Sequence, residues 1–332
     1  MRRIGVVTSG GDAPGMNAAV RAVIRTAENY GISVMGIMRG YHGLIRNEIF
    51  ELTPRSVADV IHRGGTILKS ARSKQFTTEA GQEKAVKNLQ EAGIEGLVVI
   101  GGDGSFQGGL ALQSKGIKIV GIPATIDNDI PCTDFTIGFD TALNTVVEAI
   151  NKIRDTATSH ERVYVVEVMG RNSGYIALYA GLAGGAESIL IPEVPMDLDD
   201  VVARIERSYE LGKAHSIIVV AEGFNGDLGP EVQSEQSPAF RVGSYVKERT
   251  GFETRVTILG HIQRGGSPSV FDQILASRMG EKAVRLLMQD KSGYMVGITN
   301  NEINAVGLEY ALAQEKQIDL SFYELAHMLS SS

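Results

Sequence analysis

The chain has 332 residues, 43% of them hydrophobic, so it is long enough for two domains or one large α/β unit with a substantial core. Its formal net charge of −7 argues against broad nucleic-acid binding, which needs a dominant basic face, but it leaves room for a local cationic pocket. The single cysteine excludes a disulfide network and a cysteine-rich zinc site, and no membrane-length apolar run or signal peptide is evident, so we expect a cytoplasmic protein.

The first predicted unit is a strand, a glycine turn and a helix. Residues 4–7 are apolar, residues 8–15 read TSGGDAPG, and Met16–Asn29 has helical periodicity. The turn has neither the GxxxxGK[ST] pattern of P-loop enzymes nor the GxGxxG spacing of dinucleotide-binding enzymes. The main support for a dehydrogenase is therefore missing.

The next predicted elements are a strand at residues 33–38 and a helix from Thr53 and Pro54 to about His62. Residues 63–66 (RGGT) end that helix. Residues 69–74 (KSARSK) then place three cations in one loop, which could close over an acidic site. A solvated charged loop is the alternative interpretation.

Two apolar runs in the middle of the first half end in loops that suit phosphate chemistry. Residues 97–100 and 118–122 have the pattern of buried parallel strands. GGDGS (101–105) follows the first, where glycines allow backbone N–H groups to approach an anion at a helix start. PATIDND (123–129) follows the second. Because ligands bind at the carboxyl ends of parallel strands, we expect the two loops to face one another.

These loops carry three carboxylates with few basic neighbours: Asp103, Asp127 and Asp129. Such an acidic set favours a divalent cation, and the sequence therefore predicts metal-assisted phosphoryl chemistry. Two simpler interpretations stay open. GGDGS can be only a tight connection, and the acidic loop can be a solvated turn in which Asp127 caps a helix.

The second half repeats the arrangement of strands, small-residue turns and helices. A helix over residues 140–158 begins a second α/β lobe, and a later helix covers residues 272–289. Residues 225–238 are predicted to be a surface loop and residues 330–332 a frayed tail. The predicted strands are 163–168 (followed by MGRNSG), 188–191, 216–221 (followed by Glu222 and Gly223) and 256–260 (followed by HIQRGG).

With these motifs placed, the sequence closely resembles the bacterial ATP-dependent 6-phosphofructokinases from about residue 3 to beyond residue 300. TIDNDI (125–130) and HIQRGG (261–266) are highly specific, whereas GGDG also occurs in diacylglycerol and NAD kinases. The resemblance implies an α/β fold of two Rossmann-like three-layer lobes with mostly parallel sheets, assembled as a homotetramer. It implies an ATP-binding lobe of residues 1–138 plus about 251–300, and a fructose 6-phosphate-binding lobe of residues 139–250 plus about 301–332.

The resemblance also assigns the chemistry. Asp127 matches the general base that takes the proton from the 1-hydroxyl of fructose 6-phosphate. Thr125 and Arg171 match groups that contact the transferred phosphoryl group. Asp103 matches the Mg²⁺-linked acid, with Asp129 as a second candidate ligand.

The ligand sites follow in the same way. The ATP positions are Gly11, Arg72, Ser73, Gly102, Asp103, Gly104 and Ser105. The sugar positions are Thr125, Ile126, Asp127, Met169, Gly170, Arg171, Glu222, His261, Ile262, Gln263 and Arg264, with Arg162 and Arg255 matching arginines from the neighbouring subunit. The positions of an ADP or phosphoenolpyruvate effector site between subunits are Arg21, Arg25, Arg55, Asp59, Arg154, Gly185, Glu187, Lys213 and His215.

The sequence departs from the family pattern in three places. Residues 225–236 look inserted, and Thr77 and Gln82 stand where some relatives carry arginines near the nucleotide. Pro54 and Leu211 stand where relatives often have an effector-site cation, which predicts weak effector coupling.

Two alternative functions remain. Pyrophosphate-using relatives typically have Asp and Lys where this chain has Gly104 and Ala124, which favours ATP as the donor. The other alternative is a catalytically silent sugar-phosphate or nucleotide sensor, against which the intact trio of Asp103, Thr125 and Asp127 argues.

Overall fold

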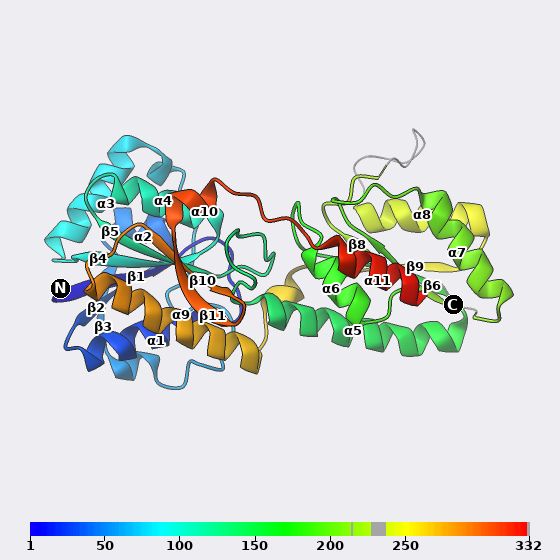
Figure 1. The fold of residues 1–332 in the computed structure, drawn as a ribbon, viewed down its shortest axis with the longest axis horizontal. Coiled ribbons are helices and arrows are strands. Elements are labelled where there is room, and N and C mark those ends of the chain that lie inside the picture. Colours follow the sequence, from blue (N-terminus) through cyan, green and yellow to red (C-terminus); the bar gives the residue numbers. More distant parts are fainter. Residues whose placement is uncertain (214, 227–236, 331–332) are drawn as a thin grey trace. The chain divides into compact units, whose positions relative to one another are not determined.

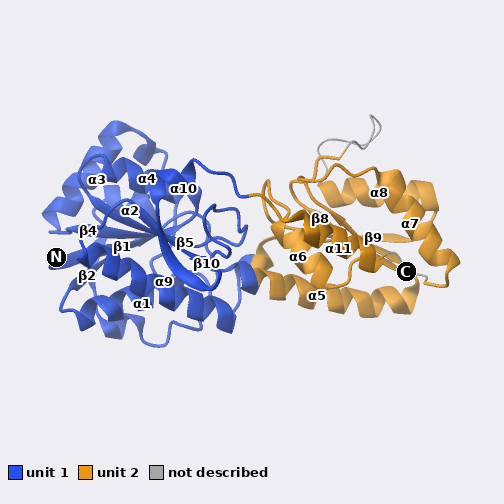
Figure 2. Ribbon diagram, viewed as in Figure 1, with its two compact units in different colours: residues 1–141, 264–316 blue, residues 142–263, 317–332 orange. Residues whose placement is uncertain are grey.

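The computed structural model describes residues 1–213, 215–226 and 237–330 (Figure 1). The chain divides into two compact units, Met1–Thr141 with Arg264–Lys316, and Ala142–Gln263 with Gln317–Ser332 (Figure 2). It therefore passes between the units three times. Each unit has a largely parallel sheet with helices, so the predicted α/β class is confirmed.

The first unit is built on a seven-stranded sheet in the order β11-β10-β5-β4-β1-β2-β3. The five inner strands are parallel, and the edge strands β3 and β11 pair antiparallel with their neighbours. The near-continuous apolar sequences of β4 and β5 are typical of strands covered on both faces. The strands are β1 (Arg3–Thr8), β2 (Ser33–Ile37), β3 (Ile49–Leu52), β4 (Gly96–Gly101), β5 (Lys118–Pro123), β10 (Tyr294–Thr299) and β11 (Glu302–Gly307).

The helices of this unit bury their apolar faces against the sheet and one another. At Gly280 of α9 an added Cβ would lie 2.6 Å from the Cβ of Ala22 on α1, so a glycine allows these two helices to approach closely. The helices are α1 (Met16–Asn29), α2 (Gly40–Ile45), α3 (Glu79–Glu91), α4 (Asp103–Gln113), α9 (Val270–Met288) and α10 (Leu308–Leu312), with 3₁₀ turns at Pro54–Val57 and Gln75–Thr77.

The helix predicted from Thr53 to about His62 is wrong. Only the 3₁₀ turn Pro54–Val57 forms, closed by a capping box between Thr53 and Ser56. Ala58 then takes an extended conformation and Asp59 a left-handed one with φ of 54°, so the chain cannot continue as a helix.

The second unit is built on a four-stranded parallel sheet in the order β7-β8-β6-β9. Its strands are β6 (Val163–Val168), β7 (Ser188–Leu190), β8 (Ser216–Ala221) and β9 (Thr254–Ile258). Its helices are α5 (Phe139–His160), which begins in the first unit, α6 (Tyr175–Ala183), α7 (Leu198–Glu210), α8 (Pro238–Thr250) and α11 (Leu320–Ser330), with a 3₁₀ turn at Gly260–Arg264.

The boundaries of the units differ from those expected. β9 pairs with β6, so the chain returns to the first unit at Arg264 and not near residue 251. β11 forms a hairpin with β10, so the chain leaves the first unit only after Lys316. Most of the predicted surface loop, residues 227–236, and the last two residues of the predicted tail lie outside the described residues. Among the described helices none has the length and apolar character needed to cross a membrane.

Candidate active site

The loop after β5, residues 124–137, carries the predicted base and is called the acidic loop below. Asp127 is 2% exposed. The Thr125 hydroxyl accepts a hydrogen bond from the Asp127 N–H at 3.2 Å and donates one to Asp127 Oδ2 at 3.3 Å. The Thr136 hydroxyl donates to the Thr125 carbonyl at 2.6 Å. The Thr125 hydroxyl and the Asp127 carboxylate therefore lie together, in a loop whose two ends are joined by the hydrogen bond between Thr136 and Thr125.

Asn128 organises the same loop, although it was not among the predicted site residues. Its backbone is left-handed, with φ of 52°, a conformation that Asn tolerates better than most residues. Its side chain donates to the Asp134 carbonyl at 3.1 Å and accepts from the Thr136 N–H at 2.9 Å. An Asn in a polar turn is a known turn signal, and it could have indicated this role.

The glycine turn after β4 leads directly into α4. Gly102 is the N-cap residue in an extended conformation, and Asp103 and Gly104, the first two helical residues, are exposed. An added Cβ at Gly101 would lie 2.4 Å from the carbonyl oxygen of Ser9, so the turns after β1 and β4 pack against each other. The exposed N-terminus of an 11-residue helix beside them suits an anion.

Other predicted nucleotide residues surround the turn after β1. The Ser70 hydroxyl donates to the Gly10 carbonyl at 2.5 Å, which places the KSARSK loop against this turn. An added Cβ at Gly11 would lie 2.6 Å from Arg264 Nη1, and that guanidinium donates to the Asp12 carbonyl at 3.2 Å. Arg72 of the loop is exposed. Arg264, predicted to contact the sugar, thus lies beside a predicted ATP residue.

Tyr41 was missed by sequence reasoning. Its buried hydroxyl donates to the Ser105 carbonyl at 2.5 Å, and its ring stacks on Phe76 with centroids 4.1 Å apart. Burial raises the pKa of the Tyr41 hydroxyl, which keeps it a neutral donor. The contact fixes the first turn of α4, and no local pattern indicates it because the two residues are 64 positions apart.

The three loop carboxylates do not form a metal cluster on their own. Among the described residues no group of three or more His, Cys, Asp or Glu side chains is arranged to hold an ion. Asp103 is exposed at the start of α4, Asp127 bonds with Thr125, and Asp129 interacts electrostatically with Lys316. The expected cluster is therefore absent. One or two hard carboxylates still fit Mg²⁺, which is commonly held by few protein ligands together with substrate phosphates and water.

In the second unit, the turn after β6 is held by two polar side chains. Glu222 Oε1 accepts from the N–H groups of Gly170 at 3.2 Å and Arg171 at 2.6 Å. Gln263 is fully buried; its Oε1 accepts from the Met169 N–H at 3.3 Å and its amide donates to the Gly260 carbonyl at 3.0 Å. The predicted sugar residues Met169, Gly170, Arg171, Glu222 and Gln263 therefore lie together. His261 and Ile262 are exposed on the neighbouring 3₁₀ turn.

Arg162 and Arg255 flank a carboxylate that the sequence reasoning missed. Arg162 Nε lies 2.8 Å from Glu253 Oε2, and Arg255 pairs with the other oxygen of Glu253. The hydrogen bond from Arg162 holds the pKa of Glu253 below its usual value. Glu253 and Arg255 are two positions apart, and side chains at this spacing lie on the same face of an extended chain. The spacing could therefore have indicated the ion pair between Glu253 and Arg255.

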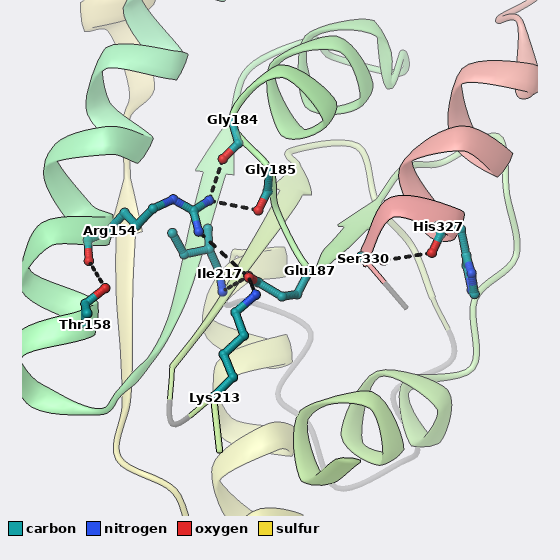
Figure 3. A network of polar contacts seen from close by, with 9 residues as sticks. All are labelled: Arg154, Thr158, Gly184, Gly185, Glu187, Lys213, Ile217, His327 and Ser330. Atoms are coloured by element: carbon teal, nitrogen blue, oxygen red, sulfur yellow. Dashed lines mark hydrogen bonds and ion pairs between the residues drawn. The ribbon is translucent and has the colours of Figure 1, made fainter. Parts of the chain in front are cut away.

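Four predicted effector residues of the second unit, Arg154, Gly185, Glu187 and Lys213, form one polar network (Figure 3). Glu187 is buried and accepts from the Ile217 N–H at 2.6 Å. Its other oxygen lies 2.5 Å from Lys213 Nζ and 3.8 Å from Arg154 Nη1. Arg154 also donates to the carbonyls of Gly184 and Gly185. Burial lowers the pKa of nearby His215, against the opposing charge of Glu187.

The predicted effector residues of the first unit are only partly gathered. Arg21 and Arg25, one turn apart on α1, line a hollow of about 430 Å³ with Arg285. Arg55 and Asp59 are exposed and do not line it. Leu211, which stands where relatives often have a cation, is 71% exposed in the second unit.

Comparison with known proteins identifies relatives of this chain. The sequence model of the family described as Phosphofructokinase matches residues 3–287. The chain is 59% identical to the ATP-dependent 6-phosphofructokinase of Halothermothrix orenii, over 99% of this chain and 100% of that protein. It is 57% identical to the ATP-dependent 6-phosphofructokinase of Brevibacillus brevis, over 99% of this chain and 100% of that protein.

Solved structures of phosphofructokinases also match this chain. The structure of phosphofructokinase from Saccharomyces cerevisiae matches 94% of this chain and 45% of its own, with a TM-score of 0.86 and 38% identity. The pyrophosphate-dependent phosphofructokinase of Marinobacter aquaeolei shares the fold, with a TM-score of 0.86 over 97% of this chain and 86% of its own, at 23% identity. From the motifs, the site geometry and these relatives, we conclude that the chain belongs to the phosphofructokinase family of enzymes.

Proposed function

We propose that the protein transfers the γ-phosphoryl group of ATP to the 1-hydroxyl of D-fructose 6-phosphate, giving fructose 1,6-bisphosphate and ADP in the cytoplasm. The contact of Thr125 with the buried Asp127 at the end of β5 carries this proposal. Asp127 would take the proton of the sugar hydroxyl as phosphoryl transfer develops. Thr125 and Arg171 would donate to the oxygens of the transferred group.

Mg²⁺ would bind through Asp103, with Asp129 as a second ligand, and would neutralise charge on the β- and γ-phosphates when bound. Gly11, Arg72, Ser73 and residues 102–105 would hold the nucleotide. The exposed start of α4 supports this assignment, because unpaired N–H groups and the helix dipole favour phosphate there.

The sugar phosphate would be recognised by His261, Ile262, Arg264 and the turn that Glu222 and Gln263 organise. Ile126 would contribute from the acidic loop. We further propose a homotetramer in which Arg162 and Arg255 reach the sugar phosphate bound to a neighbouring subunit. Arginine is suited to this role because its planar fork can bind a phosphate with two parallel hydrogen bonds. Both arginines already lie against one carboxylate, Glu253, which a phosphate would have to replace.

ATP is favoured over pyrophosphate by Gly104. An added Cβ there would meet no atom within 4 Å, so the position is open and leaves room for the adenosine moiety, which pyrophosphate lacks. A carboxylate at that position, as in pyrophosphate-using relatives, would stand beside Asp103 at the start of α4.

A coupled assay tests the proposal. ADP or phosphate release is measured with ATP or pyrophosphate as donor and a panel of sugar phosphates as acceptors. Turnover with ATP and fructose 6-phosphate is the expected result. Turnover with pyrophosphate but not with ATP would show that pyrophosphate is the phosphoryl donor. Binding of a sugar phosphate or nucleotide without turnover with either donor would show that the protein is a catalytically silent sensor.

A further inference from the structure

Asp272 is a buried acid that the proposed chemistry does not use. It lies in the first turn of α9 and is fully buried. Three donors converge on its carboxylate. Gly138 N–H donates to Oδ1 at 2.9 Å, while Thr141 N–H at 2.8 Å and the Thr141 hydroxyl at 2.6 Å donate to Oδ2.

Ser269 completes the cluster. Its hydroxyl accepts from the Asp272 N–H at 3.1 Å and donates to Asp140 Oδ2 at 2.5 Å, and its N–H donates to the Thr141 hydroxyl at 2.9 Å. We call Gly138, Asp140, Thr141, Ser269 and Asp272 the Asp272 junction. It bonds the start of α5 to the start of α9, within the first unit.

The junction lies at the end of the acidic loop. Ile137, beside Gly138, donates its N–H to the Pro123 carbonyl at 3.1 Å and forms a bridge with Ala124. The base of the loop is therefore continuous with the junction, and Thr125 and Asp127 follow within three residues of Ala124.

The glycine turn after β1 meets the same place. An added Cβ at Gly138 would lie 2.6 Å from the Cβ of Ala13, and one at Gly15 would lie 3.6 Å from the Cβ of Asp272. The end of the acidic loop, the start of α5 and the glycine turn after β1 thus pack around the Asp272 carboxylate.

The position of the junction along the chain adds to this. Thr141 is the last residue before the chain first leaves the first unit, and Arg264, where the chain returns, precedes Ser269 by five residues. A single side chain therefore holds both the outgoing and the returning segment.

We propose that Asp272 is a positioning residue for phosphoryl transfer, which fixes the end of the acidic loop and the start of α5 against α9. The inference rests on the proposed function, because transfer is what the loop would perform. Burial raises the pKa of Asp272 to about 6 despite the hydrogen bonds from Thr141 and Gly138, so the charged carboxylate is held at a cost in stability. This is expected of a group kept for position rather than for stability.

The test compares variants that keep the volume of the junction. Asp272→Asn offers one acceptor oxygen where Asp offers two, so it can bond Gly138 or Thr141 but not both. Thr141→Val removes only the hydroxyl, and Thr141→Ser restores it. Ala283→Gly, at a buried position on α9 outside the junction, is the control for loss of stability alone.

For each variant, kcat per folded subunit and both KM values are measured with ATP and fructose 6-phosphate, beside an unfolding curve. We expect kcat of Asp272→Asn to fall at least about 10-fold with both KM values within about threefold of wild type, since small displacements of reacting groups reduce rates this strongly. Thr141→Val should lose several-fold in kcat, while Thr141→Ser and Ala283→Gly should stay within about twofold.

A kcat within twofold of wild type for a folded Asp272→Asn protein would overturn the inference, as would equal losses in the Ala283→Gly control. If Asp272→Asn does not fold, the contrast between Thr141→Val and Thr141→Ser decides in the same way. An inactive wild-type enzyme would instead reject the proposed function, so the two failures can be told apart.

Discussion

Asp127 has the surroundings of a residue kept for chemistry. It is almost fully buried, it follows a buried strand, and both its N–H and its Oδ2 bond the Thr125 hydroxyl. We predict that Asp127→Ser lowers kcat by about 10²- to 10⁴-fold, the usual loss for a general base, and leaves the fold unchanged. Steady-state kinetics and circular dichroism check this. Near-normal turnover would remove Asp127 from the mechanism.

Asp272 should also leave a signature in the pH dependence of stability. Its pKa is raised from 3.8 to about 6, mainly by burial and also by the charge of Asp140. The folded state then binds more protons than the unfolded state between these values. The resulting stability is fully present below about pH 3.8 and is lost as the pH rises through about 6.

Relative to Asp272→Asn, the wild-type free energy of unfolding should therefore fall by up to about 3 kcal/mol between pH 4 and pH 7, because each pKa unit is worth 1.36 kcal/mol. Urea unfolding of both proteins across this range measures the difference. A constant difference would show that Asp272 keeps an ordinary pKa in the folded enzyme.

At the scale of single elements, the start of α4 should decide the phosphoryl donor. Gly104 has a negative φ and open space around its Cβ position, so a side chain there should not disturb the fold. We predict that Gly104→Asp raises KM for ATP at least about 10-fold, because its side chain fills open space that the adenosine moiety would use, with KM for fructose 6-phosphate nearly unchanged. Gly104→Ala is the matched control. Its smaller side chain should raise KM for ATP less, and an unchanged KM for ATP in Gly104→Asp would show that the nucleotide does not use this space.

How far the sequence predicts the elements depends on whether their signal is local. Met16–Asn29, Val163–Val168 and Ser216–Ala221 were predicted with the observed bounds because their apolar pattern is unbroken. The failed helix after Thr53 had a true start signal, and a left-handed Asp59 ended it after one turn. A strand was predicted at residues 256–260, and β9 covers Thr254–Ile258, but nothing local shows that it pairs with β6.

The candidate site follows the same rule. The positions of Asp103, Thr125, Asp127 and Arg171 were predictable because each stands within four residues of the end of a buried strand, whereas their proposed roles come from the family resemblance. The partners Tyr41 and Asp272 were not, because they act across long separations: Tyr41 reaches Ser105 over 64 positions and Asp272 reaches Gly138 over 134. The arrangement of Asp103, Asp127 and Asp129 was also beyond the sequence, since neighbouring strand ends do not fix where side chains point.

At the scale of the whole molecule, the effector network suggests weak regulation. Glu187 already binds Lys213 and Arg154, so an anionic effector must compete with this carboxylate for the same cations. We predict that sub-millimolar phosphoenolpyruvate or ADP changes KM for fructose 6-phosphate by less than about threefold, because Pro54 and Leu211 supply no further charge. Kinetics with and without each effector measure this. A strong response that Arg25→Ala abolishes would show that the lost cations are compensated.

Sharing of sugar sites between subunits leads to a test by hybrid formation. If Arg162 and Arg255 serve the neighbouring subunit, an Asp127→Ser chain still supplies both arginines and an Arg162→Ser chain still supplies the base. In a two-fold interface between the two chains, one site is then intact and the other lacks both groups. Random assembly at equal amounts makes half of the interfaces mixed, so about a quarter of the sites should be intact.

Co-expression of the two chains with different tags allows the hybrid to be isolated and assayed. We expect about a quarter of the wild-type kcat, well above either parent. A hybrid of Asp127→Ser with the Asp127→Ser/Arg162→Ser double variant is the control, because it contains no complete site. If the first hybrid is no more active than this control, Arg162 acts within its own subunit. A sugar phosphate bound to that subunit would then have to replace Glu253 as the partner of Arg162.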